Sequence, residues 1–83
     1  MRWTVVWEAE ALGKLADLWV ESADRASFSA ASNSLDDFLR RQPEQGAAFD
    51  NMLYLRREPL EIWYTISPMD CKVCVIDVRL TGK

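Results

Sequence analysis

The spacing of apolar residues changes period along the 83-residue chain, and each change marks a new element. Residues 3–7 are mainly β-branched or aromatic, which predicts a strand. From Glu8 to Ser22 the apolar residues have helical spacing, which predicts a helix. Its apolar stripe is formed by Leu12, Leu15, Ala16 and Trp19. A second helical stripe ends at Pro43, and its members are Phe28, Ala31, Leu35, Phe38 and Leu39.

The last third of the chain predicts three consecutive strands. Residues 53–56 alternate between apolar and polar or aromatic side chains, and a short turn at 57–59 leads into a second alternating strand over 60–66. After a turn at 67–70, residues 73–80 are apolar on both faces, which is typical of a central, buried strand. Residues 45–51 are expected to form a loop.

These elements predict an α+β fold in a single domain over residues 1–83. The break at 22–25 is so short that it predicts an antiparallel hairpin of the two helices. The hairpin must cover one face of a four-stranded, mostly antiparallel sheet to bury its apolar stripes. Periodicity alone leaves the order of the strands open.

Composition excludes several classes of chemistry. The net charge is −3, which argues against unaided binding of nucleic acid, because that binding depends on neutralising phosphates. The absence of histidine removes the usual proton carrier near neutral pH and the commonest metal ligand. We find no signal-peptide pattern and no apolar run near the ~20 residues of a membrane span, so a cytoplasmic location without membrane contact is expected.

Two cysteines, Cys71 and Cys74, form a C-x-x-C pattern. In a strand, residues three apart point to opposite faces, so a disulfide between them has poor geometry. A zinc site would need further ligands, and a second cysteine pair is absent. We therefore expect reduced, structural cysteines, with no metal and no cofactor.

A set of core and turn residues recurs in a particular order along the chain: 3–7, Leu12, Leu15, Trp19, Ala23, Asp24, Arg25, Leu39, Pro43, Gly46, 59–64 and 73–78. In their order and spacing these residues resemble the RelE/ParE superfamily of bacterial toxins over nearly the whole chain. The resemblance is closest to short members described as plasmid-stabilisation or RelE/ParE-like toxins. It implies that the strand at 73–80 pairs in parallel with the strand at 3–7 in the middle of the sheet.

The resemblance implies a toxin component of a bacterial type II toxin–antitoxin system, with a cognate antitoxin as its partner. Members of the superfamily either cleave messenger RNA on the ribosome or inhibit DNA gyrase. Ribosome-bound messenger, gyrase and a second copy of the chain in a homodimer are thus further candidate partners. The ribonuclease branch is metal-free and needs cations to stabilise the charge on the pentacovalent phosphate, together with a group that manages the 2′-OH proton.

The resemblance also indicates candidate site residues. Arg57 matches a frequent arginine of the family, Arg56 is its neighbour on the opposite face of the strand, and Arg79 is a third candidate catalytic cation. Glu61 stands where many active members carry an arginine, and a carboxylate there repels phosphate. Residues 79–83 supply neither histidine nor tyrosine. The candidate binding residues are Trp63, Tyr54 and Tyr64.

Several alternatives stay open at this point. Arg56 and Arg57 form either a phosphate clamp or a solvated strand edge that discourages aggregation. Trp63 either meets a base or a partner side chain, or packs beneath a helix. Two functions remain: a toxin, acting as an mRNA interferase or on gyrase, and a catalytically inert RelE-like binding module that retains the fold and the antitoxin groove.

Overall fold

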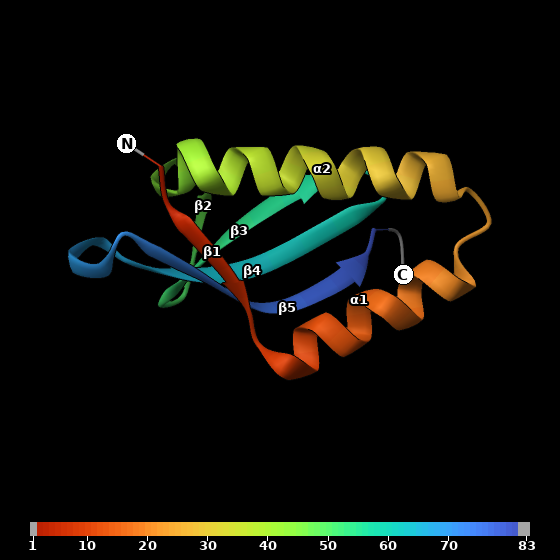
Figure 1. Cartoon of the computed structure of the whole chain (residues 1–83), viewed down its shortest axis with the longest axis horizontal. Coiled ribbons are helices and arrows are strands. Elements are labelled where there is room, and N and C mark those ends of the chain that lie inside the picture. The colour runs from red at the N-terminus through yellow and green to blue at the C-terminus, as the bar shows by residue number, and fades with distance from the viewer. Residues whose placement is uncertain (1, 82–83) are drawn as a thin grey trace.

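The computed structural model describes residues 2–81, which form two helices and one sheet (Figure 1). Short 3₁₀ turns, η1 (Pro43–Gln45) and η2 (Pro68–Asp70), follow the second helix and precede the last strand. The elements, in chain order, are β1 (Thr4–Trp7), α1 (Ala9–Glu21), α2 (Arg25–Arg41), β2 (Ala47–Phe49), β3 (Met52–Arg57), β4 (Leu60–Ser67) and β5 (Lys72–Leu80).

The sheet has five strands in the order β1-β5-β4-β3-β2. β5 pairs in parallel with β1 on one side and antiparallel with β4 on the other, so the predicted parallel pairing through the middle of the sheet is confirmed. Val75 at the centre of β5 is fully buried, as expected for a strand that is apolar on both faces.

The expected loop at residues 45–51 is wrong in part, because β2 forms within it and pairs antiparallel with β3. The connection is a tight turn at residues 50–51 in which Asp50 has a φ of 53°. Aspartate tolerates this left-handed conformation better than most residues, which lets the hairpin close. Two alanines in so short a segment are weak strand formers, so the sequence pattern concealed the fifth strand.

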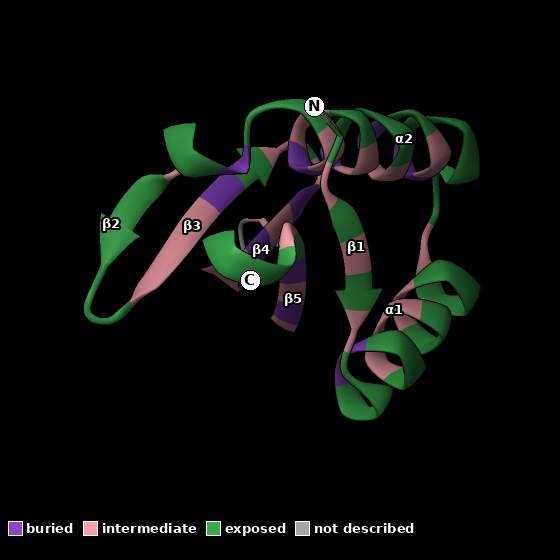
Figure 2. Cartoon of the chain, turned by 60° about the vertical axis from the view of Figure 1, so that its left-hand side comes forward, coloured by how far each residue is buried: buried purple, intermediate pink, exposed green. Residues whose placement is uncertain are grey.

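The core lies between α2 and one face of the sheet, as the buried residues in Figure 2 show. The predicted stripe of α2 is confirmed: Phe28, Ala31, Leu35 and Leu39 are buried, and Phe38 packs partly against the core. Tyr64 is fully buried beneath η1 and donates its hydroxyl hydrogen to the carbonyl oxygen of Pro43, 2.6 Å away. A Cβ at Gly46 would lie 2.1 Å from that hydroxyl, so glycine lets the chain pass over Tyr64.

The predicted stripe of α1 is wrong in part. Ala11 is the buried residue of this helix, Leu15 packs partly against the core, and Leu12 is 54% exposed. The two helices diverge from the turn that joins them (Figure 1). Leu12 and Trp19 line an open groove between the helices. Close contact between the helices is maintained near the turn, where the rings of Trp19 and Phe28 meet edge to face with centroids 5.4 Å apart.

The unequal burial of the two helix stripes makes a stability prediction. Leu35→Ala should lower the free energy of unfolding by about 2–5 kcal/mol, because Leu35 is fully buried between α2 and the sheet. Leu15→Ala should cost clearly less, because Leu15 is only half-buried and borders the groove. Urea denaturation of both variants measures the difference, and equal losses would show that α1 is packed more tightly than described.

Candidate functional site

The candidate site is the sheet face that α2 leaves uncovered, which we call the open face. Neighbouring residues on paired strands point to the same side of a sheet. The register therefore sets two rows across β3, β4 and β5 on this face. The first row is Arg56, Glu61 and Arg79, and the second is Tyr54, Trp63 and Asp77.

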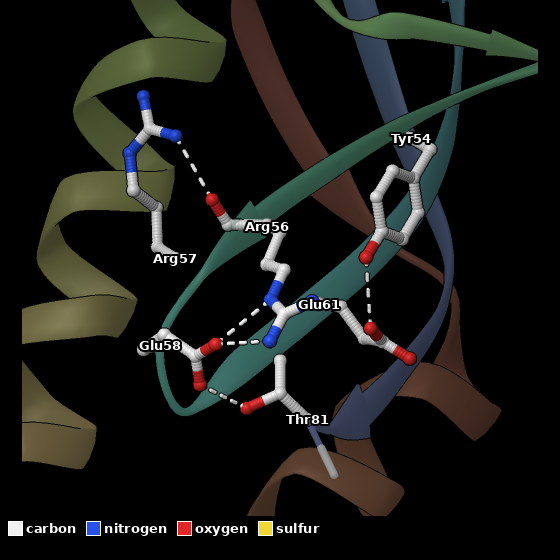
Figure 3. A network of polar contacts seen from close by, with 6 residues as sticks. All are labelled: Tyr54, Arg56, Arg57, Glu58, Glu61 and Thr81. Atoms are coloured by element: carbon white, nitrogen blue, oxygen red, sulfur yellow. Dashed lines mark hydrogen bonds and ion pairs between the residues drawn. The ribbon is translucent and has the colours of Figure 1, made fainter.

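Arg56 is neutralised by a carboxylate of its own chain. Its guanidinium donates to Glu58 Oε1 through Nε, 2.8 Å away, and through Nη2. Glu58 also accepts a hydrogen bond from the hydroxyl of Thr81 (Figure 3). The hydrogen bond from Thr81 and, to a smaller extent, the bonds from Arg56 hold the pKa of Glu58 below its usual range. The hydrogen bond and the ion pair with Glu58 raise the pKa of Arg56. The pair is exposed and so adds little stability, but it engages two of the guanidinium nitrogens and places a carboxylate beside the charge that would otherwise attract a phosphate.

Glu61 stands between Arg56 and Arg79 and is bound by Tyr54. The hydroxyl of Tyr54 donates to Glu61 Oε2 over 2.8 Å (Figure 3). Partial burial, together with this carboxylate, raises the pKa of Tyr54, so the phenol stays protonated at neutral pH. Tyr54 is therefore a donor on this face and not a base ready to take a proton.

Asp77 binds two cations from different elements. Its Oδ1 lies 2.8 Å from Lys14 Nζ on α1, and its Oδ2 lies 3.4 Å from Arg79 Nε on the same strand. Burial raises the pKa of Asp77, but the hydrogen bonds from Lys14 and the backbone N–H of Val78, with the charge of Arg79, lower it overall. The ion pair with Lys14 fastens α1 to the central strand.

Trp63 lies on the open face, which decides between the two placements that its sequence position allowed. Its ring contacts Tyr54 and Phe49 with centroids 5.3 and 6.1 Å away, and the Arg79 guanidinium lies 5.3 Å from the ring centroid. Trp63 therefore forms the centre of an aromatic cluster on the open face.

The structure separates Arg57 from the other candidate cations. Its side chain points toward α2, with the guanidinium 5.3 Å from the centroid of the Phe38 ring (Figure 3). One of its nitrogens donates to the carbonyl oxygen of Arg56 over 2.9 Å. Arg56 and Arg79 share the open face, with Glu61 between them, and Arg57 lies on the helix face.

The remaining candidates and the cysteines lie apart from a common site. Burial raises the pKa of Tyr64 to about 12, and the residue belongs to the core rather than to a binding surface. Cys71 occupies a turn with a φ of 48°, Cys74 lies on β5, and no disulfide joins them. Across residues 2–81, no cluster of three or more His, Cys, Asp or Glu side chains is arranged to hold a metal. Within the same range, no helix is long and apolar enough to cross a membrane.

Sequence reasoning missed the residues that neutralise the open face. Asp77 could have been noticed, because it is two positions from Arg79 on a strand and therefore shares its face. The contacts of Lys14 with Asp77 and of Thr81 with Glu58 join residues 63 and 23 positions apart, and only the folded chain brings them together.

Comparison with solved structures agrees with this architecture. A chain of the RelBE2 toxin–antitoxin complex from Mycobacterium tuberculosis matches with a TM-score of 0.78 at 17% identity, over 100% of this chain and 95% of that one. The isolated RelE toxin of E. coli matches with a TM-score of 0.66 at 12% identity, over 98% and 86% of the two chains. A chain of the chromosomal ParDE system from P. aeruginosa matches with a TM-score of 0.64 at 13% identity, over 94% and 95%.

These likenesses confirm that the chain has the RelE/ParE fold. At 12–17% identity they concern the fold alone. No protein-family model matches the chain, and no curated protein matches it by sequence.

The lowered pKa of Asp77 makes a prediction about acid stability. Because the pKa is lower in the folded protein than the ordinary value of 3.8, ionised Asp77 stabilises the fold above that pH. This contribution is lost as the pH falls through the folded-state pKa. Asp77→Asn should therefore be less stable at pH 7 and should lose less stability between about pH 5 and pH 2. Urea unfolding at several pH values measures this, and parallel curves for the two proteins would contradict it. Lys14→Met should also reduce the stability lost between about pH 5 and pH 2, because it removes the main partner that stabilises the ionised Asp77 carboxylate.

Proposed function

We propose that this protein is the toxin-like member of a type II toxin–antitoxin pair, that it binds a cognate antitoxin, and that it lacks ribonuclease activity. The RelE/ParE fold over the whole described chain supports the first part, together with matches to solved complexes such as RelBE2 and RelBE. The exposed groove between the helices supports the binding of an antitoxin. The charge pairing on the open face is the observation that carries the absence of ribonuclease activity.

The absence of ribonuclease activity follows from the state of the cations. Cleavage without a metal requires fixed donors aimed at the charge that develops on phosphorus, and each lost donor costs about 10²–10³ in rate. Arg56 is paired with Glu58, Arg79 with Asp77, and Glu61 lies between the two arginines. A phosphate entering here would meet carboxylates before it met an unpaired donor.

The antitoxin site that we propose is the groove between α1 and α2. Its apolar lining includes Leu12, Ala16 and Trp19 from one helix and Phe28 from the other, and it encloses about 390 Å³. Val20 extends this apolar surface and is 68% exposed. An exposed apolar groove between two helices suits the apolar face of a partner helix.

The proposed groove is tested by binding. Leu12→Asp should reduce co-purification of the antitoxin encoded beside this gene by at least about tenfold, because it places a charge in the apolar groove. Met69→Asp is the matched control, since Met69 is 98% exposed in η2, away from the groove. Equal co-purification with both variants, or loss with both, would remove the groove from the antitoxin site. Self-association of the protein through Leu12 would assign the groove to a second copy instead.

The predicted inactivity is tested on ribosome-bound messenger. We expect the purified protein to leave the message uncut under conditions in which an active RelE toxin cleaves it. Arg57→Ala should not alter this outcome, and it should lower stability only by about 0.5–1 kcal/mol through loss of the contact with Phe38. Primer extension detects cleavage. Robust cleavage by the wild type that Arg79→Ala abolishes would show that the open face is an active nuclease site.

Inhibition of a protein target such as DNA gyrase is a second candidate function. It requires a binding surface rather than unpaired phosphate-stabilising cations, and the exposed Leu12, Val20 and Phe49 offer apolar contact area. A supercoiling assay with purified gyrase tests it directly, and undiminished supercoiling at a large excess of the protein would exclude it.

A further inference from the structure

The outer edge of β1 presents backbone groups that the sheet does not use. β1 is the last strand on its side of the sheet, with β5 as its neighbour. Thr4 and Glu8 donate their backbone N–H groups to carbonyl oxygens on the β5 side, over 2.8 and 3.0 Å. Successive residues of a strand direct their backbone groups to opposite edges, so those of Val5 and Trp7 point away from β5. Within residues 2–81, no helix, turn or loop forms a backbone hydrogen bond with these outward groups.

β1 also lacks the features that keep many strand edges from pairing. Natural sheets protect an edge strand with charged residues, prolines or bulges. The four residues of β1 are Thr, Val, Val and Trp, and they pair with β5 without a shift of register. The N–H of Trp3 is used by α2, because it donates to the carbonyl oxygen of Arg40 over 2.9 Å. The N–H groups of Val5 and Trp7 therefore remain as donors on this edge, next to the outward carbonyl groups.

The segment around β1 is complementary to itself in antiparallel orientation. When two copies pair about a two-fold axis through Val5, residue 3 lies opposite residue 7 of the other copy, and residue 2 lies opposite residue 8. The outward backbone groups of the two copies then face each other, as antiparallel hydrogen bonding requires. Val5 exchanges a pair of hydrogen bonds with its counterpart, and the N–H of Trp7 donates to the carbonyl oxygen of Trp3 of the partner subunit.

The charges at the two ends of the segment match in the same register. Arg2 and Glu8 are both exposed, and within residues 2–81 neither takes part in an ion pair. The two-fold arrangement places each of them opposite a residue of the other sign. Opposite charges that face each other across an antiparallel pair stabilise it, and like charges destabilise it. The charge pattern therefore favours this register over others.

The other edge of the sheet does not have this complementarity. β2 is the last strand there, and its Phe49 borders a small cleft at Trp63 on the open face. An antiparallel pairing of β2 with itself about Ala48 places Gly46 opposite Asp50, so the aspartate has no opposite charge across the pair. Of the two edges, that of β1 is the better suited to a second copy of the chain.

We infer that the outer edge of β1 pairs with β1 of a second copy, antiparallel about Val5, and joins the sheets of two copies into one. The interface is short, so the dimer is weak, with a Kd on the order of 10–100 µM. The inference does not depend on the proposed function, because it concerns the isolated protein and an edge of the sheet away from the groove between α1 and α2.

Charge reversal tests the register by analytical ultracentrifugation of the purified protein. Arg2→Glu and Glu8→Arg should each weaken self-association by at least about tenfold, because like charges then face each other at both ends. An equal mixture of these two variants should restore association, because one copy then carries two negative charges and the other carries two positive charges. Recovery in the mixture distinguishes a direct contact from a loss of folding in either variant.

Two further variants separate the edge contact from effects on the fold. Glu10→Arg is the matched control for Glu8→Arg, because Glu10 lies in the first turn of α1 and outside the paired segment, and it should leave association unchanged. Val5→Pro should abolish association and retain the fold, because it removes an N–H that points outward, where an edge strand tolerates proline. Circular dichroism checks the fold of all the variants.

Amide hydrogen exchange gives a second readout on the unmodified protein. The Val5 amide should exchange more slowly as the protein concentration rises, because its N–H is bonded only in the dimer. The Val6 amide points toward β5 and should be protected at every concentration.

The inference is overturned by a folded protein that stays monomeric at about 1 mM, which is about tenfold above the weakest expected Kd. It is also overturned if Val5→Pro leaves the dimer intact, or if the mixture of folded charge variants does not associate. A dimer that Leu12→Asp abolishes and Val5→Pro does not would place the second copy in the helix groove instead. Slow exchange of the Val5 amide only with a co-purified partner bound, and no dimer at any concentration, would assign the edge to a strand of that partner.

Discussion

The parallel pairing of β1 with β5 is the constraint on which the rest of the structure depends. Parallel neighbours cannot be joined by a tight turn, so the chain must travel across the sheet between them. Here the two helices and three antiparallel strands occupy that path. β5 is consequently enclosed by β1, β4 and the helix layer, and its inward-facing valines Val73, Val75 and Val78 are fully buried. The same strand presents Asp77 and Arg79 to the open face, so the element that organises the core also supplies the candidate site.

The chemistry of the open face is governed by pairing rather than by the number of charges. Arginines on a sheet surface would attract phosphate if their donors were unpaired. In this chain Arg56 and Arg79 each face a carboxylate close in sequence, and Glu61 separates them. An ion pair of this kind contributes little to stability, but it lowers the local field that a polyanion would follow. The aromatic cluster around Trp63 is unaffected by this neutralisation, so the surface retains contact area suited to a polypeptide.

The groove between the helices and the cleft at Trp63 differ in their origin. The groove between α1 and α2 exists because the helices diverge after a short turn, which leaves Leu12 and Trp19 unburied. The cleft at Trp63 exists because β2 extends the sheet and brings Phe49 beside β3 and β4.

The amino-acid sequence by itself determined the elements whose burial follows from local period: the α2 stripe, the alternation of β4 and the apolar β5. The repeat of apolar residues describes their spacing along one helix or strand. It therefore identifies the buried face only when a single side of that element is apolar. α1 is apolar on adjacent sides, and only the tertiary structure decided that Ala11 faces the core while Leu12 faces the groove. The alternation of side chains along β3 placed Arg56 and Arg57 on opposite faces of the sheet. The position of α2 decided that Arg56 lies on the open face and Arg57 on the helix face. The partners of Asp77 and Glu58 were decided in the same way, because electrostatic contacts depend on distance in space, and residues far apart in sequence come close only through the fold.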